Sequence, residues 1–108
     1  MMNQFIVIGR LTKEVETREE NGEKKSFLSV AVARSFKNNE GIYETDFFTC
    51  ETSGNIGENV SNWCQKGDIL GIKGRLQTKK DENNNYIPVL VAEKVTFLSS
   101  RKEESEED

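Results

Sequence analysis

The chain has 108 residues, enough for one hydrophobic core but not for two, and its longest apolar runs have four residues, such as 5–8 and 89–92, which excludes a membrane span. It has no histidine, no Cys-x-x-Cys pair and no carboxylates grouped with other metal ligands, so we expect neither a metal site nor a cofactor. The net charge is −4, but residues 103–108 hold five of the nineteen acids; the other 102 residues, with fifteen bases and fourteen acids, carry +1. Such a balanced body can bind phosphates where its cations share one face.

The N-terminus carries no basic leader and no small-residue cleavage site, so we expect a soluble, cytoplasmic protein. In that compartment Cys50 and Cys64 are expected to stay as buried thiols rather than to form a disulfide.

The first half of the chain contains four segments rich in β-forming residues, separated by polar turns. These segments span residues 3–11, 14–18, 26–34 and 42–52. Asn21-Gly22, between the second and third segments, is a strong signal for a two-residue hairpin. The pattern therefore predicts short antiparallel strands.

The period then changes to that of a helix. The apolar residues that recur on one helical face are Ile56, Val60, Trp63 and Cys64. They predict a helix of about three turns that buries Trp63 in the core, so we do not expect Trp63 to take part in binding a ligand at the surface. Ser53 or Asn55 can cap the start of this helix, and Lys66-Gly67 supplies the signal that ends it.

Two more strands are predicted at 68–80 and 86–98. The predicted fold is all-β: an OB-fold, a five-stranded Greek-key barrel with one helix between strands 3 and 4 that plugs its open end. A β-sandwich would need more strands and no helix at this point. We expect residues 1–100 to form this domain and residues 101–108 to be an acidic, disordered tail.

The segment 70–79 alternates between apolar and cationic side chains. Leu70, Ile72, Gly74 and Leu76 fall on one side and are predicted to point inward, which turns Lys73, Arg75, Gln77 and Lys79 outward. Cations about 6.5–7 Å apart along one face match the spacing of phosphates along an extended nucleic-acid strand. An ordinary solvated face would give the same pattern.

Two adjacent phenylalanines must point to opposite sides of their strand. Phe48 is predicted to point inward, and Phe47, which alternates with Thr49 and Glu51, outward, where it either stacks on bases or meets another subunit. Phe36 lies in a predicted loop among cations.

Three further aromatic side chains are assigned to packing: Phe27, Tyr86 and Phe97. Residues 5–8 place apolar side chains on both faces of the first strand, more than one barrel needs, and this predicts a subunit interface.

Several segments resemble the bacterial single-stranded DNA-binding protein family, in the order and at nearly the spacing of that family over residues 2–99. These are 2–12, 34–36, 45–47, 59–60, 66–67 and 71–78. The resemblance implies an OB-fold protomer that forms a homotetramer and wraps single-stranded DNA over its outer surface. It implies base stacking on Phe36 and Phe47, and phosphate contacts from Arg34, Lys37, Lys73, Arg75, Lys79 and Lys80.

Two departures from the family pattern bear on this interpretation. Ser53 and Asp81 fall where relatives often carry an aromatic residue, and the acidic tail lacks the terminal apolar residues that dock on replication and repair proteins, which argues against recruiting such partners through it.

The predicted function is non-catalytic, sequence-nonspecific binding of single-stranded DNA in replication, recombination or repair. An OB-fold replication accessory of the primosome type, whose main partner is a protein, is the alternative. RNA in place of DNA stays open, and a nuclease is disfavoured because the acids are scattered.

Overall fold

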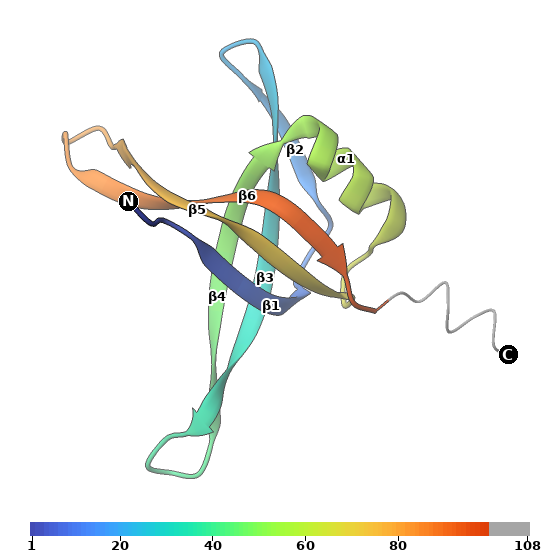
Figure 1. Cartoon of the computed structure of the whole chain (residues 1–108), viewed down its shortest axis with the longest axis vertical. Coiled ribbons are helices and arrows are strands. Elements are labelled where there is room, and N and C mark those ends of the chain that lie inside the picture. Colours follow the sequence, from blue (N-terminus) through green and yellow to red (C-terminus); the bar gives the residue numbers. More distant parts are fainter. Residues whose placement is uncertain (100–108) are drawn as a thin grey trace, which may run out of the picture.

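The computed structural model describes residues 1–99, and most of them lie in strands (Figure 1). In chain order the elements are β1 (Phe5–Leu11), β2 (Glu16–Glu20), β3 (Glu23–Lys37), β4 (Tyr43–Ser53), α1 (Gly54–Trp63), β5 (Ile69–Lys80) and β6 (Tyr86–Phe97). No helix in this part of the chain is both long and apolar enough to cross a bilayer. The tail predicted for residues 101–108 lies outside the described residues.

Five of the strands close into a barrel. They follow the order β1-β5-β6-β4-β3, and β3 returns to β1 through pairs such as Arg10 with Ala31. Every pairing is antiparallel except the short contact between β4 and β6, where Cys50 lies opposite Leu90. β2 pairs only with β3, outside the ring. In chain order α1 therefore lies between the third and fourth strands of the ring, and the predicted OB-fold is confirmed.

Local sequence explains most of this arrangement. Asn21 and Gly22 both have positive φ, which a two-residue hairpin turn requires, and they connect β2 to β3. Leu28 and Val30 are fully buried, and Phe27 and Ser29 on the other side of the strand are buried as well, so this part of β3 is covered on both faces. β3 continues to Lys37 instead of ending at Arg34, so Phe36 stands near a strand end and not in a loop.

The core fills the barrel and its helical plug. Its buried members are Leu11, Leu28, Val30, Cys50, Val60, Cys64, Leu70, Ile72 and Ala92. Both cysteines are free, as predicted, and burial raises the pKa of each thiol to about 11, with Asp68 contributing at Cys64. Both thiols are therefore protonated and unreactive at neutral pH.

Ser53 is the N-cap of α1, and its hydroxyl accepts a hydrogen bond from the Ile56 amide at 3.4 Å. The buried side of α1 is centred on Gly57 and Val60, because the helix approaches β3 so closely that a Cβ at Gly57 would collide with Ser26. Trp63 lies on the other flank of Val60 and in the last helical position. It is 54% exposed, so its predicted place in the core is wrong.

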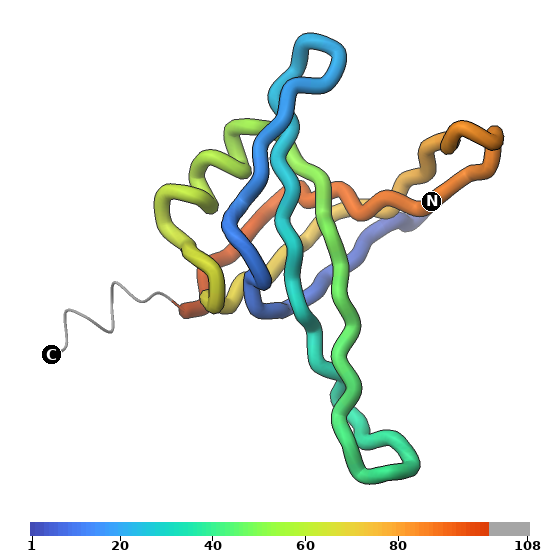
Figure 2. Tube along the Cα trace, turned by 180° about the vertical axis from the view of Figure 1, so that it is seen from behind, coloured from blue at the N-terminus to red at the C-terminus, as the bar shows by residue number. Residues whose placement is uncertain are grey.

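Three hairpins extend beyond the barrel, at β2–β3, β3–β4 and β5–β6, and both views show them pointing in different directions (Figures 1 and 2). Leu76 lies where the β5–β6 hairpin leaves the barrel and is 47% exposed, which corrects its predicted inward position. Tyr86, on the same hairpin, and Phe97, at the end of β6, are also exposed, contrary to their assignment to packing, whereas Phe27 is buried.

Candidate nucleic-acid interface

A continuous surface runs over the outward sides of β3, β4, β6 and β5, and we call it the outer face. The outer face includes Lys25, Phe47, Glu51, Arg75, Gln77, Lys79 and Val91. Glu51 and Phe47 share one side of β4, whose register with β3 is regular from residue 45 to 53. Glu51 forms ion pairs with Lys25 of β3 and with Lys79 of β5, and these contacts link three strands of the surface.

Phe47 is the most prominent aromatic residue on the outer face. Its side chain is 72% exposed, while Phe48 packs partly buried against the core, so the predicted orientations of both are confirmed. Ala31 lies opposite Phe47 on β3 and leaves the ring open to solvent. An exposed phenylalanine ring flanked by a small residue is a flat surface on which a base can stack.

The β3–β4 hairpin carries a second group of exposed rings. Phe36 is 64% exposed, close to a register shift between Ala33 and Lys37. Lys37 lies opposite Tyr43, with its ammonium 5.6 Å from the ring centroid. The sequence reasoning missed Tyr43, although its alternation with Phe47 along β4 was a signal that it points outward.

Arg34 lies on the other side of this hairpin. Its guanidinium donates two hydrogen bonds to Asp46, at 2.9 and 3.0 Å, and one to Glu44 at 2.6 Å. These contacts lower the pKa of the Asp46 carboxyl, because hydrogen bonds from Arg34 stabilise its charged form. Asp46 and Phe47 are adjacent on β4, so the structure does not bring Arg34 to the outer face.

The cationic side of β5 is exposed, as predicted, but acids from other strands reach it. Arg75 donates to Glu93 at 2.9 Å and to Gln77 at 3.1 Å, and Lys79 donates to Glu51 at 3.2 Å. The alternation of β5 contained no acid on this side, and the carboxylates come from β6 and β4. Only the strand pairing places them there.

The two other predicted cations of β5 occupy different positions: Lys73 shares the outward side of β5 with Arg75 but lies in the stretch that pairs with β1, and Lys80 falls on the opposite side of the strand. Lys73 pairs with Ile6 of β1 and with Lys94 of β6. Lys80, near the tip of the β5–β6 hairpin, places its ammonium 5.3 Å from the ring centroid of Tyr86. The predicted residues are thus distributed over the outer face, two hairpins and the β1 side of the barrel.

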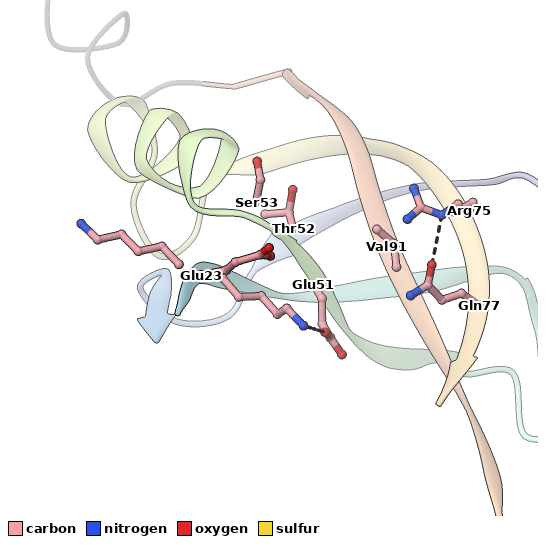
Figure 3. Close-up of a pocket in the computed structure, with 9 residues that line it drawn as sticks. Glu23, Glu51, Thr52, Ser53, Arg75, Gln77 and Val91 are labelled. Carbon is pink, nitrogen blue, oxygen red and sulfur yellow. Dashed lines mark hydrogen bonds and ion pairs between the residues drawn. The ribbon is translucent and has the colours of Figure 1, made fainter. Parts of the chain in front are cut away.

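A shallow groove of about 230 Å³ crosses the outer face between the β2–β3 hairpin and β5 (Figure 3). It is lined by Glu23, Lys24, Lys25, Glu51, Thr52, Ser53, Arg75, Gln77 and Val91. The sequence analysis did not include Lys25 because the strand predicted there starts at residue 26, whereas β3 begins at Glu23. Within residues 1–99 no three or more histidine, cysteine or acidic side chains gather as metal ligands would.

The fold and this surface define a class: a small OB-fold protein whose exposed aromatic and cationic side chains lie on an open face instead of in an enclosed pocket. Residues 2–98 match the Single-strand binding protein family, and the chain belongs to that family.

Two relatives illustrate the match. The chain is 40% identical over 107 residues to Single-stranded DNA-binding protein 3 of Listeria innocua, covering 94% of this chain and 67% of the relative. It is 36% identical over 113 residues to Single-stranded DNA-binding protein B of Bacillus subtilis, covering 100% of both.

Solved structures share the fold at lower identity. The Plasmodium falciparum SSB in complex with ssDNA superposes with a TM-score of 0.74 and 21% identity, covering 92% of this chain and 96% of that one. A small single-stranded DNA-binding protein from Streptomyces coelicolor gives 0.67 and 17%, covering 91% and 95%.

Proposed function

We propose that the protein binds single-stranded DNA without sequence preference, in the cytoplasm, during replication, recombination or repair, and that it does so without catalysis. The observation that carries this proposal is the exposed Phe47 ring on a barrel face that also presents Arg75 and Lys79. Both requirements for binding a single strand, a π-surface and cations, meet there. The names of the relatives describe the same activity.

In this mechanism bases leave the solvent to stack on aromatic rings, while cations neutralise the phosphates between them. We assign stacking to Phe36 and Phe47. We assign phosphate contacts to Arg34, Lys37, Lys73, Arg75, Lys79 and Lys80. Because these residues lie on several sides of the barrel and its hairpins, one strand reaches them all only by wrapping around the protein.

Binding of this kind is indifferent to sequence for a physical reason. Every base has a π-face that an aromatic ring can accept, and phosphates are identical along the strand. The outer face is an open surface with a shallow groove, and nothing in it encloses the edges of a base.

The salt dependence of binding tests this function. We expect thymidine, cytidine and adenosine oligomers to bind with similar affinity, and log K to fall with log salt at a slope between about −2 and −4 per protomer, since each neutralised phosphate contributes about −0.7. A fluorescence titration at several salt concentrations measures both quantities. Absence of binding at low salt, or a strong preference for one base, contradicts the proposal.

We further propose that the protein is a homotetramer that uses the exposed side of β1. Ile6 and Ile8 are 63% and 58% exposed there, and with Leu98 they line a largely apolar depression between β1, β5 and β6 that Lys73 and Lys94 also border. Exposed apolar patches mark interaction surfaces, and a two-fold axis can pair such a strip with the same strip of a second copy.

Introducing a charge tests this interface. Ile8→Glu is expected to give a smaller species than wild type in sedimentation equilibrium, because a buried, unpaired carboxylate would disfavour association. Ile42→Glu, an equally exposed position on the β3–β4 hairpin, should leave the mass unchanged. Equal masses for wild type and Ile8→Glu would exclude this strip as the interface.

A further inference from the structure

Glu51 lies at the centre of the outer face and joins three strands. One carboxylate oxygen is 3.3 Å from the Lys25 ammonium of β3, and the other is 3.2 Å from the Lys79 ammonium of β5. Its side chain is 14% exposed, whereas those of the two lysines are 36% and 53% exposed. The lysines therefore cover the carboxylate from both sides, and Figure 3 shows Glu51 with one of its dashed contacts beside the groove.

The other acid–base contacts of the surface differ from this one. Arg75 and Glu93 form a single pair whose side chains are about half exposed, at 45% and 50%, and Arg34 with its two acids lies on the opposite side of the β3–β4 hairpin. Glu51 alone among these acids on the outer face is largely covered, and solvent screens a covered pair less than an exposed one. The Glu51 hydrogen bond is also the main reason why the pKa of Lys25 is raised.

A carboxylate between two ammonium groups resembles a phosphate between the same groups, in charge and in the oxygen atoms that accept hydrogen bonds. We propose that Glu51 is an intramolecular competitor of the DNA phosphates: it holds Lys25 and Lys79 in the free protein, and both lysines bind DNA only in exchange for this contact. The inference rests on the proposed function and adds Lys25 to the site.

This arrangement reduces what the two lysines contribute to binding. A phosphate that reaches either ammonium meets the nearby negative charge of Glu51, and Glu20 also lies 3.5 Å from the Lys25 ammonium, so the two lysines with these two acids carry no net charge. Binding is therefore weaker and less dependent on salt than the number of cations on the outer face predicts.

The first experiment removes the negative charge and keeps the shape of the side chain. Glu51→Gln is expected to bind a thymidine oligomer roughly three- to tenfold more tightly at low salt. The slope of log K against log salt should be steeper by about 0.7, because Lys79 is released whereas Lys25 keeps its contact with Glu20 at 3.5 Å. Glu58→Gln, which removes the same charge from the exposed side of α1, is the matched control and should bind as wild type does. A Glu51→Gln variant that binds as wild type does overturns the inference.

The second experiment tests the exchange directly. Lys79→Gln should cost little affinity in the wild-type background and several-fold more in the Glu51→Gln background, since coupled residues show non-additive effects. Equal losses in the two backgrounds would mean that Glu51 and the DNA do not compete for Lys79.

A third comparison needs no change at Glu51. In otherwise wild-type protein, Lys79→Gln should weaken binding less than Lys37→Gln, because the Lys37 ammonium faces a tyrosine ring and not a carboxylate. The reverse order overturns the inference even if Glu51→Gln does not fold.

The same measurements separate the role of Glu51 from the proposed function. If wild-type protein fails to bind the oligomer at all, the proposed function fails as well. If it binds and only these differences are absent, the function stands and the role of Glu51 does not.

Discussion

Phe47→Ala is expected to weaken binding to a thymidine oligomer by about five- to hundredfold, the range that the loss of one stacked base gives. The Phe47 ring is 72% exposed and lies across from Ala31, so its removal takes away little packing. The free energy of unfolding should therefore stay within about 0.5 kcal/mol of wild type, as for other surface substitutions. A loss of affinity without a loss of stability identifies the ring as part of the binding surface.

A fluorescence titration with a labelled oligomer, accompanied by urea unfolding, measures both quantities. Trp63→Ala serves as the control, because Trp63 is an exposed aromatic residue on α1, away from the outer face. Phe36→Ala should also weaken binding. Unchanged affinity in both phenylalanine variants would instead favour an OB-fold replication accessory whose main partner is a protein.

One observation favours the alternative of a protein-binding accessory. At positions 53 and 81, where relatives often carry an aromatic residue, the side chains are used to hold the backbone. Asp81 organises the β5–β6 turn, because its carboxylate accepts hydrogen bonds from the amides of Asn83 and Asn85, both at 2.9 Å. Ser53 is committed to the N-cap of α1. Neither position offers a ring for stacking, and this makes the contribution of Phe47 decisive.

Gly74→Ala is expected to destabilise the fold by about 3 kcal/mol or more, the size of effect that overpacking of a core can reach. A Cβ at residue 74 would collide with the carbonyl oxygen of Val91 and approach the Phe5 ring to 2.9 Å. Gly74 pairs with β1 on one side and with β6 on the other, next to a register shift in the β5–β6 ladder. The strand cannot move away without breaking one of these pairings.

Gly71→Ala is the matched control on the same strand. A Cβ at residue 71 would meet its nearest neighbour, the Leu98 side chain, at 3.5 Å, which is an ordinary van der Waals contact. Urea unfolding followed by circular dichroism should show Gly71→Ala within about 1 kcal/mol of wild type, as for a substitution that fits its site. A Gly74→Ala variant as stable as wild type would show that β5 and β6 do not pack as described.

The amino-acid sequence was sufficient to predict features that depend on one segment alone. The opposite orientations of Phe47 and Phe48 follow from a period of two residues, and the hairpin at Asn21-Gly22 follows from turn chemistry. These are local rules, and they hold wherever one face of a strand is buried.

Contacts between residues of different strands could be known only from the folded arrangement. The alternation of β5 presented a row of free cations, but pairing of the strands brought Glu93 to Arg75 and Glu51 to Lys79. Trp63 became exposed because the position at which α1 packs on β3 fixes the buried side of the helix. Charge pairs and helix contacts depend on register and on close approach between distant segments, and no pattern within one segment contains that information.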